Sequence, residues 1–149
     1  IINRFQDEPT RFEEYCAGLF RAYGYTATVT PPARDGGYDI FLERGGMTWI
    51  VECKLYGRGH RVGRPVLQKL YGANSGIGAD GMIVVTTSGY SADALAYASD
   101  TGIETIDGDR LVDMCRAAWG TRRPQAILPA AMATLTRSEL RSGYPADMR

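Results

Sequence analysis

Two apolar segments separated by a pair of glycines constrain the fold of this chain most strongly. The segments span residues 38–43 (YDIFLE) and 49–54 (WIVECK), and Gly45 and Gly46 lie between them. β-Branched and aromatic residues are typical of strands, and a glycine pair is typical of a tight hairpin turn. The sequence therefore predicts an antiparallel β-hairpin that folds back at the two glycines.

Three charged side chains are predicted to meet at the open end of this hairpin. Pairing about the glycines sets Asp39 opposite Val51 or Glu52. Glu52 and Lys54 are two residues apart, so they project to the same face of their strand. The hairpin is therefore expected to bring two carboxylates together with an ammonium group beside them.

This arrangement predicts a metal site. Two adjacent carboxylates repel each other unless a cation lies between them. Mg²⁺, with Mn²⁺ as the alternative, takes one or two carboxylates and completes its coordination with water and phosphate oxygens. Such a metal polarises a phosphodiester and acidifies a water molecule, while a lysine orients that water or holds the phosphate. The pattern thus predicts phosphodiester hydrolysis, with Asp39 and Glu52 as metal ligands and Lys54 as the water-positioning residue.

Basic residues follow this strand without intervening acids. The net charge of the chain is +0, which argues against bulk electrostatic binding of nucleic acid. Between Cys53 and Ala79, however, every charged side chain is basic. The glycine-containing loop in this region has two interpretations: a solvated segment, or a segment that binds phosphates. Its position directly after Lys54 favours phosphate binding. The predicted DNA-binding residues are Arg58, His60, Arg61, Arg64 and Lys69.

Composition and length bound the class of protein. The 149 residues are predicted to form one core over residues 1–119, followed by an arginine-containing arm or linker over 120–149. Three scattered cysteines fit no disulfide framework and no zinc spacing, so we expect reduced core cysteines in a cytoplasmic protein. No apolar run is long enough to span a bilayer. The first residue is isoleucine, which suggests a fragment or a processed product.

The order of predicted elements defines an α/β fold. A helix capped by Thr10 precedes three strands, and a second helix begins at Pro65. The apolar run 81–87 is typical of a central strand covered on both faces. Ser91 and Asp107 are predicted to cap two further helices, with a short strand between them. This order predicts three layers, with helices on both faces of a mixed sheet.

The ordered motifs resemble the Mrr-type branch of the PD-(D/E)xK nuclease superfamily. Asp39 followed by Glu52-x-Lys54 across a hairpin matches its core, with Tyr38 in place of the usual proline. The resemblance covers about residues 10–119. The other matching segments, in order, are Phe12-Glu13, Asp35-Gly36-Gly37, Gly63-Arg64-Pro65, Gln68, Gly72-Ala73, Val84-Val85-Thr86-Thr87-Ser88 and Ile106-Asp107-Gly108.

The resemblance implies a restriction-endonuclease-like fold and a Mg²⁺-dependent DNA endonuclease that defends against foreign DNA. It also implies a separate target-recognition domain outside this chain. Glu13 matches a glutamate that assists metal binding, although Glu13 alone reads equally well as the acid of a helix capping box. Gln68 matches a polar residue that lines the active site, although alone it reads as a surface residue. Cleavage of both strands of a duplex needs two sites, so we expect a homodimer on DNA.

The sequence leaves two alternatives to a restriction endonuclease open. One is a DNA-binding module on the same scaffold that does not cut, or a Holliday-junction-resolving relative. The other is an unrelated α/β domain in which Glu52 and Lys54 form a surface pair. The intact set of Asp39, Glu52 and Lys54 argues against an inactivated copy.

Overall fold

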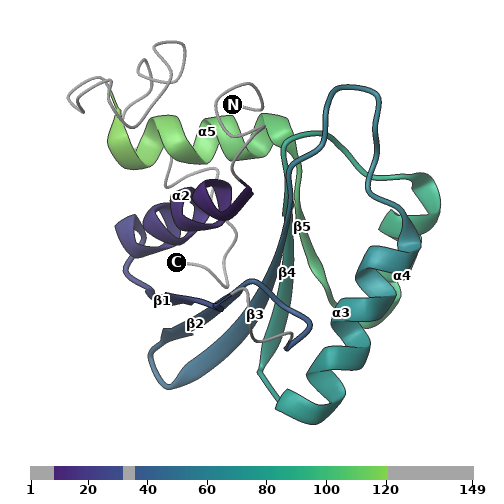
Figure 1. The fold of residues 1–149 in the computed structure, drawn as a ribbon, viewed down its shortest axis with the longest axis horizontal. Helices are drawn as coiled ribbons and strands as arrows, with labels where there is room; N and C mark the ends of the chain where they lie inside the picture. The colour runs from purple at the N-terminus through teal and green to yellow at the C-terminus, as the bar shows by residue number, and fades with distance from the viewer. Residues whose placement is uncertain (1–8, 32–35, 121–149) are drawn as a thin grey trace.

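The structure is a computed structural model that describes residues 9–31 and 36–120 (Figure 1). The described residues form a single five-stranded sheet, and the strands lie in the order of the sequence, β1-β2-β3-β4-β5. The elements are α2 (Pro9–Ala22), β1 (Thr26–Val29), β2 (Ile40–Arg44), β3 (Met47–Lys54), α3 (Arg64–Ile77), β4 (Gly81–Thr86), α4 (Ala92–Thr101), β5 (Glu104–Ile106) and α5 (Gly108–Trp119).

The predicted hairpin is confirmed. Strands β2 and β3 pair antiparallel, from Arg44 opposite Met47 to Ile40 opposite Val51. Gly45 and Gly46 form the two-residue turn, with φ of 61° and 81°. Positive φ at both turn positions matches the twist of the flanking strands, and glycine adopts it without steric cost. The turn therefore sets the register of the whole hairpin.

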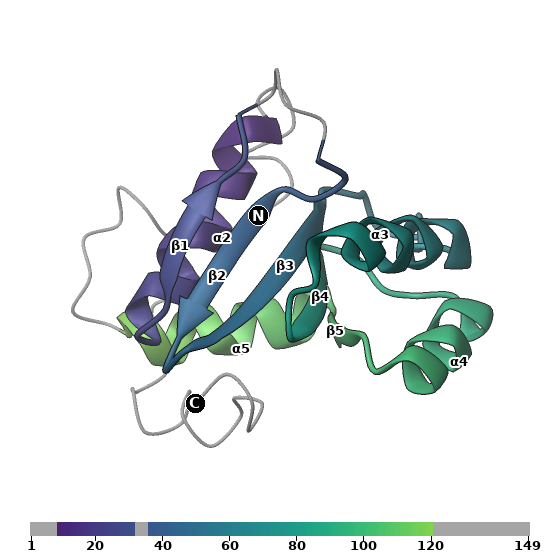
Figure 2. The same cartoon turned by 90° about the horizontal axis from the view of Figure 1, so that it is seen from below.

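The sheet is mixed, as the order of elements predicts. β1, β2 and β3 pair antiparallel, whereas β3, β4 and β5 pair parallel. Figures 1 and 2 show α2 and α5 on one face of the sheet and α3 and α4 on the other. Successive strand residues alternate between these layers. In β3, Val51 packs in the core under α2 and α5, while Ile50 packs in the core under α3 and α4.

The helix caps are partly as predicted. Ser91 and Asp107 are N-caps, and their side chains accept hydrogen bonds from the backbone N–H groups of Ala94 and Arg110. The predicted cap at Thr10 is wrong, because Pro9 is already helical and Thr10 lies inside the helix. Proline lacks an N–H donor and has a helical φ, so it suits the first turn of a helix.

Some of the sequence predictions fall on residues that the structure does not describe. Residues 121–149, most of the predicted arm, lie outside the described residues, as does the predicted turn at Asp35. All three cysteines are described, and each is buried and free of disulfide bonds. Among the described helices, none is long and apolar enough to cross a membrane.

Gly108 joins the start of α5 to the segment that follows β4. Its backbone N–H donates to Ser88 O at 2.8 Å. A Cβ atom at Gly108 would lie 2.3 Å from the backbone O of Thr87. A backbone atom cannot move aside as a flexible side chain can, so α5 approaches this segment as closely as only glycine allows.

We therefore expect Gly108→Ala to lower the free energy of unfolding by about 1–3 kcal/mol. The matched control is Gly18→Ala in α2, where an added Cβ meets nothing within 4 Å. Alanine also favours helix, so this control is expected to be neutral or to gain about 0.5–1 kcal/mol. Urea unfolding of both variants measures the difference. Equal stability of the two variants would contradict the close contact at Gly108.

Candidate active site

Glu52 and Lys54 lie together at the carboxyl end of β3. They share the face of the strand that also carries Ile50, toward α3 and α4. Lys54 Nζ is 3.3 Å from Glu52 Oε2, and the two side chains are 32% and 14% exposed. Burial lowers the pKa of Lys54, but the negative charge of Glu52, with smaller contributions from Tyr56 and Asp39, outweighs it, so the pKa is raised. Lys54 is therefore an ammonium group at neutral pH.

Asp39 is fixed beside this pair by two hydrogen bonds across the hairpin. Its backbone N–H donates to Val51 O at 2.8 Å. Its carboxylate oxygen Oδ2 accepts from the Cys53 N–H, also at 2.8 Å. The side chain of Asp39 thus takes the place of a backbone acceptor where β2 begins. This geometry sets the Asp39 carboxylate next to the stretch of β3 that carries Glu52.

The carboxyl group of Glu52 is perturbed by burial and by Asp39. Burial and then the charge of Asp39 raise the pKa of Glu52 to about 7, while Lys54 and Lys69 act in the opposite direction. The cationic side chains therefore do not offset the combined effect of burial and the Asp39 charge. A site in which a carboxylate retains a proton up to neutral pH is electrostatically prepared for an added cation.

Glu13 approaches the same acids from α2. Burial, followed by the charge of Asp39, a side-chain hydrogen bond with Asp39 and the charge of Glu52, together raise the pKa of Glu13 to about 7. Helix α2 lies on the opposite face of the sheet from α3. Both helical layers therefore contribute side chains to one site at the end of the central strands.

The carboxylate oxygens of this site suit Mg²⁺, which keeps water or phosphate ligands, better than a metal that protein side chains coordinate completely. In residues 9–31 and 36–120, no three His, Cys, Asp or Glu side chains form a ready-made cage for a metal. Mg²⁺ commonly binds through one or two carboxylates and retains waters or phosphate oxygens. Asp39 and Glu52, whose charges act on one another, provide such a pair. Glu13 adds a third acid at the margin of the site.

A pocket of ≈ 220 Å³ opens on the α3 side of these residues. Glu52 and Lys54 line it with Lys69, which the sequence analysis assigned to DNA binding. Gly37 completes the pocket wall with a φ of 82°, and a Cβ there would lie 2.8 Å from Ala73 Cβ. The remaining lining residues are Pro65, Val66 and Leu70.

Gln68 lies elsewhere on α3. It is exposed and does not line the pocket that contains Glu52, although Lys69, the next residue, does. Adjacent helical residues project about 100° apart, so the docking of α3 decides which of the two faces the site. The assistance predicted for Gln68 stays a prediction.

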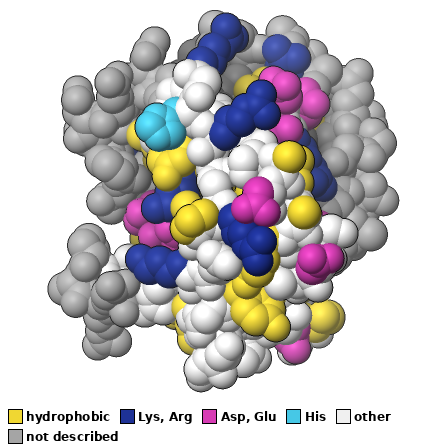
Figure 3. Space-filling view, turned by 90° about the vertical axis from the view of Figure 1, so that its right-hand side faces the viewer, with side chains coloured by type: hydrophobic (Ala, Val, Ile, Leu, Met, Phe, Trp, Pro, Cys, Tyr) yellow, Lys and Arg dark blue, Asp and Glu magenta, His cyan; other side chains and the backbone are white. Residues whose placement is uncertain are grey.

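Apart from Lys69, the predicted DNA-binding residues divide into two groups. Arg58, His60 and Arg61 are exposed on the loop after β3. Figure 3 shows the face formed by α3 and α4, with His60 in cyan and basic side chains above and below it. Arg64 instead pairs with Asp93 at 3.3 Å, and a phosphate would have to displace this partner to bind Arg64.

Hydroxyl groups at the end of β4 are site features for which the sequence analysis assigned no role. Thr86 is fully buried, and its Oγ1 donates to the backbone O of Lys54 at 2.8 Å. Thr87 and Ser88 bond in a similar way to the loop that follows Lys54. A run of hydroxyl residues directly after a buried strand was the available signal. Its partners became evident only from the parallel pairing of Lys54 with Thr86.

Comparison with known proteins identifies the family. Residues 6–115 match the family model of the Mrr catalytic domain, described as a restriction endonuclease. The chain is 34% identical over 123 residues to the type IV methyl-directed restriction enzyme EcoKMrr of Escherichia coli (strain K12). That match covers 76% of this chain but only 40% of EcoKMrr, so this chain corresponds to less than half of that relative.

Solved structures share the fold. The DNA modification-dependent restriction endonuclease AspBHI has a TM-score of 0.67 at 20% identity, covering 95% of this chain and 36% of that chain. MspJI restriction endonuclease, solved with a 27-mer oligonucleotide, has a TM-score of 0.57 at 15% identity, covering 95% of this chain and 37% of that chain. With the family match and the geometry at the end of β3, these findings show that the chain belongs to the Mrr-type restriction endonuclease family.

Proposed function

We propose that this chain is the cleavage domain of a restriction enzyme and hydrolyses phosphodiester bonds of DNA with Mg²⁺. The observation that carries the proposal is the meeting of Asp39, Glu52 and Lys54 at the end of the central hairpin. Membership of the restriction endonuclease family supports the same reading. Mn²⁺ has similar ligand preferences and is the alternative metal.

Asp39 and Glu52 would hold the metal, and Glu13 would assist them. A bound divalent cation supplies Lewis acidity toward the phosphate and lowers the pKa of an attacking water. The hydrogen bond from Cys53 N–H orients the Asp39 carboxylate, which has about four lone-pair sites and so could take a metal beside its bonds to Cys53 and Glu13. Glu52 is mostly buried, so its orientation is restricted before any ligand arrives.

Lys54 would act as a donor and a fixed positive charge. In the metal-free site its raised pKa keeps it protonated at neutral pH, which favours a role as a hydrogen-bond donor over one as a base. An ammonium at this position orients that water or stabilises the charge that develops on the phosphate. The role assigned to Lys54 is therefore positioning and electrostatic stabilisation.

The substrate, partners and setting of the whole protein are part of this proposal. MspJI was solved with an oligonucleotide, and EcoKMrr is described as methyl-directed. These relatives are much longer than the present chain, which is consistent with target recognition by a separate domain. We further propose a homodimer on duplex DNA, because two sites are needed to cut both strands, and a cytoplasmic defence role.

Replacing Lys54 tests the catalytic assignment. We expect Lys54→Ala to lower the rate of plasmid nicking in Mg²⁺ by at least about 100-fold, because a preorganised charge at the reacting phosphate is lost. DNA affinity measured without metal should change little. Lys54→Arg retains the positive charge, so it separates the effect of losing that charge from other effects of replacing Lys54. Nicking by Lys54→Ala at the wild-type rate would exclude Lys54 from the chemistry. A parallel assay of wild type on methylated and unmethylated plasmids would show any preference for modified DNA.

The raised pKa of Glu52 predicts how stability depends on pH. Between the ordinary value of 4.5 and about 7, the folded protein binds more protons than the unfolded chain. The free energy of unfolding without metal should therefore fall as pH rises through this window, by up to about 1.4 kcal/mol per pH unit for one such group. Glu52→Gln should flatten this dependence, whereas Glu43→Gln, at an exposed strand position, should not. Identical pH profiles for wild type and Glu52→Gln would contradict the raised pKa.

The same carboxylates predict stabilisation by metal. Mg²⁺ binds only the folded site and should raise the melting temperature more at pH 8 than at pH 5.5, since the ligands must be deprotonated. Asp39→Asn and Glu52→Gln should each remove most of this shift, while Glu43→Gln should preserve it. Thermal unfolding with and without Mg²⁺ measures the effect without any nuclease assay. A full shift in both active-site variants would exclude these residues as ligands.

A further inference from the structure

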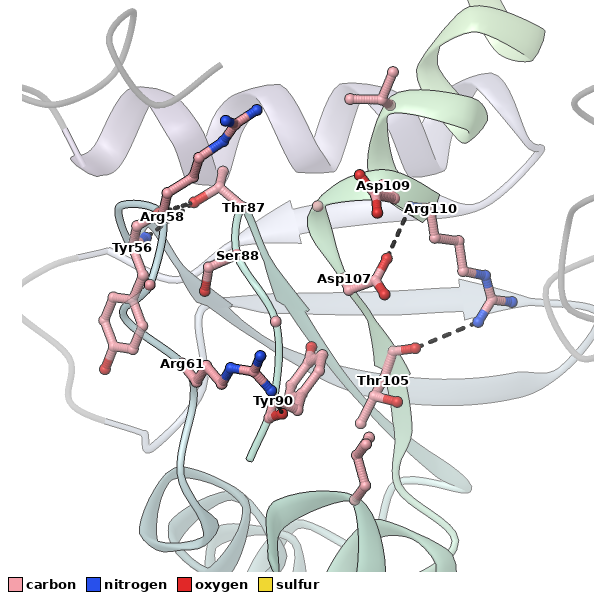
Figure 4. A pocket seen from close by; sticks show the side chains of 15 residues that line it. Tyr56, Arg58, Arg61, Thr87, Ser88, Tyr90, Thr105, Asp107, Asp109 and Arg110 are labelled. Atoms are coloured by element: carbon pink, nitrogen blue, oxygen red, sulfur yellow. Dashed lines mark hydrogen bonds between the residues drawn. The ribbon is translucent and has the colours of Figure 1, made fainter. Parts of the chain in front are cut away.

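A second, larger hollow lies at the carboxyl ends of β4 and β5. Its volume is ≈ 830 Å³, and it is lined by part of the loop 56–61, the segment 87–90, residues from 105–112, and Leu95 of α4. Figure 4 shows the loop on one side of this groove and the start of α5 on the other. Tyr56 lines the groove and lies two residues after Lys54, so the groove adjoins the candidate active site.

The two walls of the groove carry opposite charges. Arg58 and Arg61 project from the loop wall, and Asp107 and Asp109 lie on the α5 wall (Figure 4). Among the described residues, neither arginine forms an ion pair, and Arg61 makes only a long contact of 3.5 Å to Tyr90 O. Asp107, by contrast, already accepts the backbone N–H of Arg110 at 2.8 Å. The loop wall therefore offers unneutralised positive charge.

Arg110 also lines the groove, but its side chain is bound to the α5 wall. Its Nη1 donates to Thr105 O at 3.3 Å, and in Figure 4 its side chain points along that wall, away from the loop. The acids beside it disfavour a phosphate on this side. An anionic chain that entered the groove would accordingly lie against Arg58 and Arg61.

The loop wall is held in place by hydroxyl groups from the segment after β4. Thr87 Oγ1 accepts from the Tyr56 N–H at 2.9 Å and donates to Tyr56 O at 2.7 Å. Ser88 Oγ donates to His60 O at 2.7 Å. The Val62 N–H donates to Gly89 O at 2.8 Å and closes the loop. The arginines therefore project from a wall that is fixed at both ends.

The chain length between the two sites limits their separation. Lys54 and Arg58 are four residues apart, so their backbones are separated by at most roughly 14 Å. One DNA strand advances roughly 3.4 Å along the duplex axis per nucleotide. A strand whose phosphate lies at Lys54 would consequently pass Arg58 within about four nucleotides.

We propose that this groove binds the phosphodiester backbone of the substrate strand, with Arg58 within about four nucleotides of the bond that is cut. Arg58 and Arg61 contact the phosphates, the hydroxyls of Thr87 and Ser88 position the loop, and the acidic wall confines the strand to the loop side. This inference rests on the proposed nuclease function, because it places the groove beside a scissile phosphate.

The test compares a DNA duplex with a small phosphodiester that cannot reach the groove. The full chain, as wild type and as Arg58→Ala/Arg61→Ala, is assayed on a short synthetic duplex and on bis(p-nitrophenyl) phosphate. We expect the ratio of kcat/KM for the duplex to that for the small ester to fall roughly tenfold in the double variant. Arg21→Ala removes the same type of charge from α2, where Arg21 is exposed, pairs with Glu14 and does not line the groove, so this control should change the ratio less than about twofold.

Binding without metal gives an independent measurement. Fluorescence anisotropy of the labelled duplex in EDTA should show weaker binding by the double variant, with the dependence of log affinity on log salt reduced by about 2. Asp109→Asn should strengthen binding, because it removes repulsion from the acidic wall. Thr87→Val, which loses both bonds to Tyr56, should weaken binding in the same direction as the arginine variants.

Two outcomes would overturn the groove assignment. One is wild-type duplex affinity and an unchanged kcat/KM ratio in the double variant. The other is an equal loss on both substrates, which would mean that the loop shapes the catalytic centre and does not bind flanking DNA. If wild type cleaves neither substrate, the proposed nuclease function fails, and the affinity measured in EDTA still decides whether the groove binds DNA.

Discussion

The hydrogen bond from the Cys53 N–H to the Asp39 carboxylate organises the candidate site. It joins the start of β2 to the end of β3 at the point where regular backbone pairing of the hairpin stops. Because β-strand side chains alternate, fixing Asp39 to the backbone of Cys53 places it next to the face that carries Glu52 and Lys54. From that placement the charge of Asp39 acts on Glu52, Lys54 and Glu13.

The site stores unfavourable electrostatic energy. Two glutamates have pKa values raised to about 7, primarily because they are buried and secondarily because of Asp39. In a purely structural cluster such repulsion would be a defect, since an apolar replacement would pack at lower cost. Conflict of this kind is expected where a fold retains groups for binding a cation or for chemistry.

Features encoded locally were predictable from the sequence, and features set by docking were not. The hairpin followed from turn chemistry and strand pattern, and the caps at Ser91 and Asp107 followed from residue type and spacing. The orientation of α3 did not follow, because a helix presents every face until it packs, and Lys69 rather than Gln68 lines the pocket. The bonds of Thr86 and Thr87 also required the register of two parallel strands, which no local pattern specifies.

The origin of Glu13 in α2 has a consequence for folding. Glu52 and Lys54 face the layer of α3 and α4, yet Glu13 reaches them from the layer on the other side of the sheet. The complete set of side chains therefore exists only after both layers have closed on the sheet. A nascent or partly unfolded molecule would hold these groups apart, so the candidate site forms as a unit only in the fully folded chain.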